Sequence, residues 1–130
     1  MTRSLWVVAA AALGLGLAAC GDDDDGGNGQ PAACTPPATA TVRFAADVHP
    51  ILTASCGTCH GDAGTLSKFG SATDQTSYDA VKAKVSTATP AQSRLLVKGN
   101  GGDGHVGGDR LSDADSARIQ TWIAECAQDN

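Results

Sequence analysis

The most specific chemistry in this sequence lies in one short stretch, Cys56-Gly57-Thr58-Cys59-His60. Two thiols three positions apart, followed at once by an imidazole, have the spacing that attaches a c-type haem covalently. The thiols add to the two vinyl groups of the porphyrin, and the neighbouring imidazole becomes the proximal ligand of the iron. The sequence therefore predicts one covalent haem c, bound by Cys56 and Cys59 with His60 on the iron.

Two other types of site use a Cys-x-x-Cys pair. A thioredoxin-like redox pair belongs to a strand–helix unit, and the residues around Cys56 and Cys59 do not have that pattern. A structural zinc site needs a second pair of Cys or His ligands at similar spacing, and the chain has none. The haem interpretation is therefore preferred.

Residues 1–19 have the pattern of a secretory signal, with Arg3 followed by an apolar run and small residues. The apolar run, residues 5–17, is shorter than the about 20 residues that a membrane span needs. The segment ends at Cys20 in a sequence that resembles the lipobox of bacterial lipoproteins, which predicts cleavage before Cys20 and its lipidation. The alternative is an ordinary signal cleaved nearby. Either signal directs the chain out of the cytoplasm, to the periplasm or the cell surface.

Residues 20–41 are predicted to be a flexible tether on the lipid anchor. They begin with four aspartates, Asp22–Asp25, and continue with glycines and prolines, so they contain little that could be buried. A run of like charges in such a stretch indicates solvation rather than a cation site. The whole chain has a formal net charge of −5. It lacks a basic patch for nucleic acid, so we expect membrane contact through the lipid alone.

The remaining cysteines, Cys34 and Cys126, are predicted to form a disulfide. An oxidising compartment favours such a bond, and lipid and haem account for the other three cysteines. The bond would tie the tether to the end of the chain. Two free thiols are the alternative.

Residues 42–130 are expected to form one all-α domain of three or so helices around the haem. Asp47 is predicted to cap a helix that has Pro50 in its first turn and leads into Cys56. A second helix is expected from Ser77, and a third after Ser112, which can act as its cap. Their apolar faces comprise Val48, Ile51 and Leu52; Tyr78, Val81 and Val85; and Ile119, Trp122, Ile123 and Cys126. The face of the third helix is expected to pack on the first.

Large aromatic side chains are few in this domain: Phe44, Phe69, Tyr78 and Trp122. A haem would supply the missing apolar mass, so the haem-free chain is expected to be poorly folded.

The order of these features resembles the small class I-like c-type cytochromes of the planctomycete-type family. The likeness covers about residues 43–126 and rests on the following positions: Phe44-x-x-Asp47-Val48-x-Pro50-Ile51-Leu52, the haem motif with Gly61, Tyr78-x-x-Val81, Ser93-x-Leu95-Leu96, His105-x-Gly107-Gly108, Leu111 and Trp122-Ile123. It implies a helical fold in which the first and last helices cross and the haem lies in a cleft. The chain has Cys126-Ala127 where the family often has Gly-Ala. Class I cytochromes usually have a distal Met, whereas the only Met here is Met1.

The sixth position of the iron must then be filled by His105, His49, another donor such as Lys98, water, or nothing. We favour His105, because it lies in a glycine-rich loop that can approach a flat ligand closely. His49 is the weaker candidate, since it lies beside Pro50 at the start of the predicted first helix.

Two functions fit a single haem c on a lipid anchor. One is a monomeric electron carrier, not an enzyme, that exchanges electrons with redox partner proteins. The other is a haem enzyme or a gas- or peroxide-binding sensor with an open distal position. A domain of about 90 residues leaves little wall for a substrate pocket, which favours the carrier.

Overall fold

The computed structural model describes residues 34–130. The predicted signal segment, the lipidation of Cys20 and most of the tether lie outside this range. Over the described residues the chain is helical and has no β-strand, only one isolated bridge between Asn100 and Asp109, so the all-α prediction is confirmed there. None of the helices in residues 34–130 is long and apolar enough to cross a membrane.

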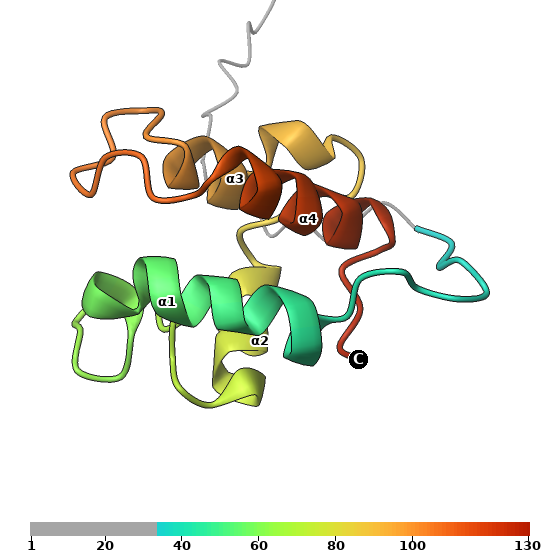
Figure 1. Ribbon diagram of the computed structural model, residues 1–130, viewed down its shortest axis with the longest axis horizontal. Helices are drawn as coiled ribbons and strands as arrows, with labels where there is room; N and C mark the ends of the chain where they lie inside the picture. The colour runs from blue at the N-terminus through green and yellow to red at the C-terminus, as the bar shows by residue number, and fades with distance from the viewer. Residues whose placement is uncertain (1–33) are drawn as a thin grey trace, which may run out of the picture.

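Four α-helices and two shorter helical turns follow one another along the described chain (Figure 1). In order they are the π-helical turn Phe44–Val48, α1 His49–His60, α2 Asp74–Lys82, the 3-10 turn Pro90–Gln92, α3 Arg94–Gly99 and α4 Asp113–Ala124. The ribbon has two layers, with α1 and α2 in one and α3 and α4 in the other (Figure 1).

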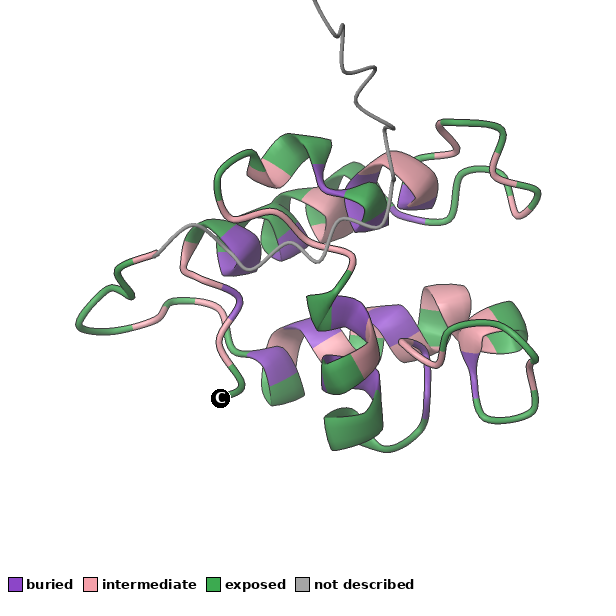
Figure 2. Cartoon of the chain, turned by 180° about the vertical axis from the view of Figure 1, so that it is seen from behind, coloured by how far each residue is buried: buried purple, intermediate pink, exposed green. Residues whose placement is uncertain are grey.

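One hydrophobic core lies between the two layers. Its buried residues are Phe44, Val48, Leu52, Tyr78, Val81, Leu95, Leu96, Leu111, Ile119, Trp122, Ile123 and Ala127. Figure 2 shows these buried positions on the facing sides of the helices. Three aromatic rings form the centre of the core, because Phe44 lies 5.1 Å from Tyr78 and 5.3 Å from Trp122 between ring centroids.

The first helical segment begins earlier than the sequence predicts. Asp47 does not cap the helix that contains Pro50, because the chain is already helical from Phe44. The Asp47 carboxylate instead accepts a hydrogen bond from the Arg43 amide at 2.8 Å, within the π-helical turn. The prediction of Asp47 as the cap of α1 is wrong, because the N-cap of α1 is Val48 and it makes no side-chain hydrogen bond to the helix. Leu52 of α1 is fully buried, as the apolar pattern indicates.

Helix α2 begins at Asp74 rather than Ser77 and ends at Lys82, so Val85 lies beyond it. Ser77 is buried inside the helix, and its hydroxyl donates to the Phe69 carbonyl. Tyr78 and Val81 face the core as predicted. Helix α3 is not predicted from the sequence.

The cap of α4 and its apolar residues Ile119, Trp122 and Ile123 match the prediction, but the helix makes more contact with the turn Phe44–Val48 than with α1. Ser112 is its N-cap, and its hydroxyl oxygen accepts the Asp115 amide at 3.1 Å. The apolar residues of α4 are buried against the core, where Trp122 contacts Phe44 of the turn that leads into α1. Cys126 lies two residues past the end of the helix, with a positive φ of 76°.

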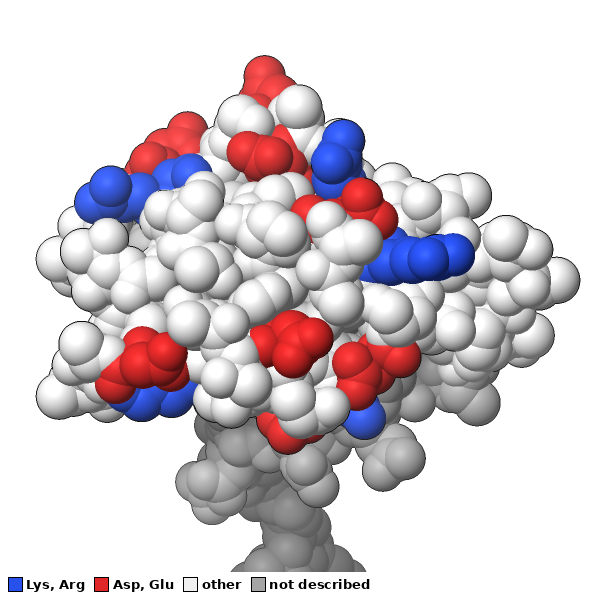
Figure 3. All heavy atoms as spheres, turned by 60° about the horizontal axis from the view of Figure 1, so that its bottom comes forward, with Lys and Arg blue, Asp and Glu red and all other residues white. Residues whose placement is uncertain are grey.

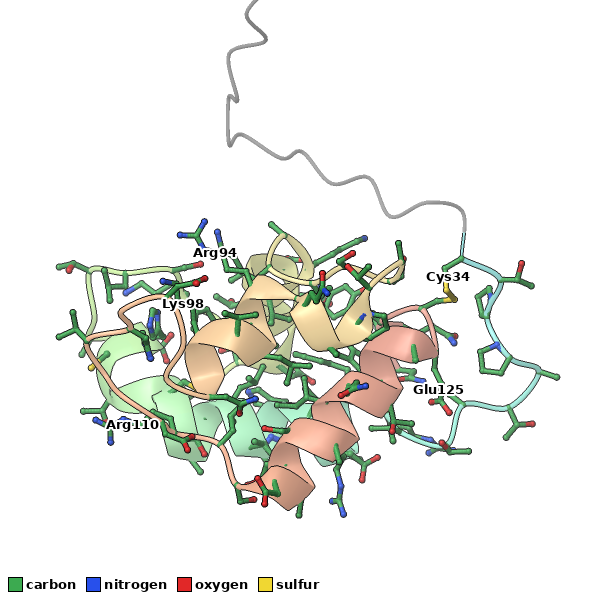
Figure 4. The ribbon with its side chains drawn as sticks, turned by 90° about the horizontal axis from the view of Figure 1, so that it is seen from above. Cys34, Arg94, Lys98, Arg110 and Glu125 are labelled. Atoms are coloured by element: carbon green, nitrogen blue, oxygen red, sulfur yellow. A yellow bond between two sulfur atoms is a disulfide. The ribbon has the colours of Figure 1, made fainter. Side chains whose placement is uncertain are left out.

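The segment that begins at Cys34 is fastened to the end of α4. Cys34 and Cys126 form a disulfide with a Cα–Cα distance of 5.5 Å, the pairing that the cysteine count predicts. Beside it, the Glu125 carboxylate accepts hydrogen bonds from the hydroxyl and amide of Thr41 and from the Val42 amide. Figure 4 shows the disulfide and Glu125 at one end of the molecule, with the loop that follows α3 at the other. Part of the predicted tether, from Cys34 onward, therefore follows the domain surface.

Candidate haem site

The three residues of the haem motif lie at the C-terminal end of α1, which ends at His60. Residues three apart share one face of a helix, so Cys56 and Cys59 lie on the same side of α1. Both are free thiols, Cys56 partly buried and Cys59 exposed. A group bonded to both sulfurs would therefore lie along the end of α1 and reach the surface at Cys59.

Burial raises the pKa of the Cys56 thiol to about 11, although the guanidinium of Arg110 acts in the opposite direction. Redox-active cysteines in Cys-x-x-Cys pairs have a lowered pKa, because the thiolate is the reactive form. The environment of Cys56 is thus unlike that of a thioredoxin-type nucleophile. This agrees with the rejection of a redox-active pair in favour of a haem.

The loop after α1 holds the imidazole of His60 from two sides. The Nδ1 atom lies 3.1 Å from the Ser67 carbonyl oxygen, and the ring stacks on Phe69 with a centroid distance of 4.1 Å. A carbonyl oxygen only accepts hydrogen bonds, so Nδ1 carries the proton. The Nε2 atom is then the free lone-pair donor, the form in which an imidazole binds a metal.

This loop folds back closely on the haem motif. A Cβ atom on Gly61 would lie 2.2 Å from the Gly57 carbonyl oxygen, a distance that real side chains do not reach. Gly61 is therefore required for the chain to turn directly after His60. The turn is closed by a hydrogen bond from the Gly70 amide to the His60 carbonyl at 3.0 Å.

His105 lies opposite His60, in the loop between α3 and α4. The centroids of the two imidazole rings are 6.4 Å apart, and the ring planes differ by 28°. The Nδ1 atom of His105 is 3.0 Å from the Gly108 carbonyl oxygen, so by the same reasoning its Nε2 is the free lone-pair donor. The structure thus brings the two predicted ligands together from segments 45 residues apart.

The separation of the two rings fits one metal ion between them. With metal–nitrogen bonds of about 2 Å, and ring centres about 1 Å behind the ligating nitrogens, two axial imidazoles have centres about 6 Å apart. Both rings also have the carbonyl partner on Nδ1 that metal-bound histidines typically have. The ring separation and the two Nδ1 partners are therefore compatible with an iron between His60 and His105.

The other distal candidates are placed elsewhere. His49 is at the start of α1, about 16 Å along the helix from His60 at 1.5 Å per residue, and its Nε2 is 2.9 Å from the Ser71 carbonyl oxygen. The Lys98 ammonium donates to the Asp103 carbonyl and lies 4.0 Å from the Asp103 carboxylate. His49 is thus too far away to share an iron with His60, and Lys98 has partners of its own.

Apolar surface is exposed on both loops that hold the two histidines. Leu66, in the loop after His60, is 54% exposed, and Val106, next to His105, is fully exposed. No other large hydrophobic side chain in residues 34–130 is exposed to this degree.

The charged side chains of residues 34–130 do not form a separate metal site. Acidic and basic side chains are interspersed with uncharged ones on the face shown in Figure 3. Within residues 34–130 no three His, Cys, Asp or Glu side chains are grouped so that they could hold a metal ion by themselves. Two axial histidines are enough for an iron that the porphyrin already coordinates.

Sequence reasoning missed the residues that orient the ligands. The partners of His60 are the Ser67 carbonyl and the Phe69 ring, and the partner of His105 is the Gly108 carbonyl. A backbone carbonyl has no signature in a sequence. The position of Phe69 nine residues after His60, in a loop with little other apolar material, was the one usable signal.

Comparison with known proteins gives no relative. No family model matches the chain, and no curated protein and no solved structure was found to be similar to it. The functional assignment therefore depends on the residues and their geometry.

Proposed function

We propose that this chain is a single-haem c-type cytochrome that carries electrons outside the cytoplasm, anchored to a bacterial membrane through a lipid on Cys20. The observation that carries the proposal is the meeting of the Cys56–His60 motif with His105, at a ring separation of 6.4 Å. The all-α architecture and the cysteine motif on its first long helix agree with a small class I-like cytochrome c fold.

Each residue of the site has a definite part in this proposal. Cys56 and Cys59 would hold the haem covalently, His60 would be the proximal ligand and His105 the distal one. When bound, a c-type haem supplies an iron that is reduced and oxidised by one electron. The chain keeps both imidazoles in the ligating form, because a backbone carbonyl accepts the Nδ1 proton of each ring.

Two features favour electron transfer over catalysis on the iron. Two fixed histidines leave no free position for a substrate, and hydrogen bonds from both rings to backbone limit their movement when the charge changes. Exposure of Cys59 would bring one edge of the cofactor to the surface, where redox partner proteins can approach it. We therefore propose a monomeric carrier and not an enzyme.

The first experiment asks whether the haem is present. Intact mass and the alkaline pyridine spectrum of the purified protein, made in a host with cytochrome c maturation, should show one covalent haem c. Cys56→Ala/Cys59→Ala should lack it, and Cys34→Ala, the matched control, should retain it. An unmodified mass for the wild-type domain would overturn the proposal.

The second experiment tests the distal ligand. The wild-type ferric protein should have a low-spin spectrum, and His105→Ala should convert it to a high-spin spectrum that responds to cyanide. His49→Ala, the matched control, should leave the spectrum unchanged. A wild-type protein that is already high-spin would indicate a ligand-binding haem protein instead of a carrier. A His105→Ala variant that stays low-spin would show that another residue is the distal ligand.

A further inference from the structure

The ammonium of Lys68 closes the loop that follows α1. Its Nζ donates hydrogen bonds to the carbonyl of Gly61 at 3.2 Å, to that of Asp62 at 2.8 Å and to that of Gly64. An ammonium has three protons, and all three are used here within one turn of chain. Hydrogen bonds from a charged donor are stronger than neutral ones, so Lys68 is a main stabilising element of this loop.

Lys68 stands between the two residues that orient His60. Ser67 supplies the carbonyl for Nδ1, and Phe69 supplies the ring that stacks on the imidazole. The Lys68 carbonyl in turn accepts the Ser71 amide at 2.9 Å. The side chain and the backbone of Lys68 thus fix the same segment from both directions.

We propose that Lys68 is a positioning residue for His60. By fixing the loop, it keeps the Ser67 carbonyl within hydrogen-bond distance of Nδ1 and so maintains the strength with which Nε2 donates to a metal. This inference rests on the proposed function of His60 as an axial ligand. A hydrogen bond from Nδ1 makes the imidazole a better donor and stabilises the oxidised iron, which lowers the reduction potential.

The loop also has a tie that does not involve the Lys68 ammonium. The Asp62 carboxylate accepts the Ser71 hydroxyl at 2.6 Å and the Ala72 amide at 3.1 Å. The Gly70 amide also bonds to the His60 carbonyl. Removing the Lys68 charge should therefore loosen the loop without detaching it, so the variant is expected to fold and to keep its haem.

Lys68→Met, which keeps an unbranched side chain but removes the ammonium, is the test. The reduction potential of the variant should shift upward, and the amides of Gly64 and Gly70 should exchange with solvent about tenfold faster than in the wild type. Lys84→Met is the matched control. It removes the same charge from a side chain that makes no hydrogen bond in the described part of the protein, so both quantities should stay at their wild-type values.

The two readouts separate this inference from the proposed function. If the wild type contains haem c, an unchanged potential in Lys68→Met overturns the positioning role even if the melting temperature falls. An equal shift in Lys84→Met also overturns it, because the effect would then be one of charge alone. If the wild type contains no haem, the proposed function fails, and the positioning role fails with it, because His60 then has no iron to bind.

Discussion

Removal of the Cys34–Cys126 disulfide should lower the stability of the fold by an amount that follows from the length of the loop it closes. The bond joins residues 92 positions apart, so it greatly reduces the number of conformations open to the unfolded chain. In the chain-entropy description, a loop of that length stabilises the folded state by about 4.6 kcal/mol at 25 °C. Cys34→Ala/Cys126→Ala should therefore lower the free energy of unfolding by up to about 4.6 kcal/mol, which corresponds to a fall of about 20–35 °C in Tm.

The native fold at this end of the molecule does not depend on the disulfide alone. Glu125 binds Thr41 and Val42, and the last residue, Asn130, accepts the amides of Phe44 and Ala45. These contacts should keep the folded structure of the variant intact, so the loss should arise mainly in the unfolded state. The spectrum of the proposed haem should not change, because the disulfide and the loop that contains His105 lie at opposite ends of the molecule (Figure 4).

Urea denaturation followed by far-UV circular dichroism is the assay. The variant should unfold at a lower midpoint with a larger m value, since an unfolded chain without the cross-link exposes more surface. Thiol titration of the denatured, unreduced wild type should find neither Cys34 nor Cys126 free. Labelling of Cys34 and Cys126 themselves in that titration, identified by peptide mass, or an unchanged midpoint in the variant, would refute the reasoning.

Three smaller changes test other parts of the structure. Hydrogen bonds from the Thr41 hydroxyl and the Val42 amide lower the pKa of Glu125. The carboxylate therefore contributes its full stabilisation above pH 4.5, and this is lost as the pH falls through the depressed pKa. Between pH 4.5 and the depressed pKa, the free energy of unfolding should fall less steeply with pH in Glu125→Gln than in the wild type. Gly61→Ala should destabilise by at least about 2 kcal/mol in urea, because its Cβ would meet the helix backbone. Ser112→Ala should cost about 1 kcal/mol in the same assay through loss of the α4 cap.

Each of these three predictions has a result that would contradict it. A parallel acid profile in Glu125→Gln would show that the carboxylate contributes nothing to stability. An unchanged midpoint in Gly61→Ala would mean that the loop can move away at no cost. An unchanged midpoint in Ser112→Ala would show that the α4 cap is replaced by another hydrogen-bond partner.

Local signals explain which elements could be predicted from the sequence. Helix α4 has a cap residue, acidic residues in its first turn and an apolar face, and all of these act within the helix itself. Helix α3 has only six residues, too few for a periodic pattern, and it is stabilised by burial of Leu95 and Leu96 in the common core. The turn Phe44–Val48 was not predicted, because Pro50 indicates the first turn of a helix, whereas the chain is already helical from Phe44.

The residues of the candidate site also differ in whether local sequence signals could predict them. Cys56, Cys59 and His60 lie within five residues, so a haem could be proposed from their spacing alone. His105 could be proposed only by elimination, because its distance from His60 depends on how two layers of helices pack. The part of Ser67 could not be foreseen, since it contacts His60 through a backbone carbonyl. The hydrogen bonds of the Lys68 ammonium go to backbone carbonyls of the same loop, which also have no signature in the sequence.

The burial pattern also revises the expectation for a haem-free chain. The end of the domain with Phe44, Tyr78 and Trp122 is packed entirely by protein, and the disulfide lies at the same end. At the His60 end, Phe69 is only partly buried, and Leu66 and Val106 are exposed. Loss of the haem should therefore affect the two ends differently, rather than leave the whole chain poorly folded.

Amide hydrogen exchange on Cys56→Ala/Cys59→Ala can distinguish these outcomes. Amides in residues 61–70 and 100–110 should lose their protection, because these loops would then have no apolar group to pack on. Amides in the middle of α4 should remain protected, because Ile119, Trp122 and Ile123 pack against protein side chains. Uniform loss of protection would restore the original expectation that the haem is most of the core. Unchanged protection in both loops would show that the loops fold by themselves, and the exposure of Leu66 and Val106 would then need another explanation.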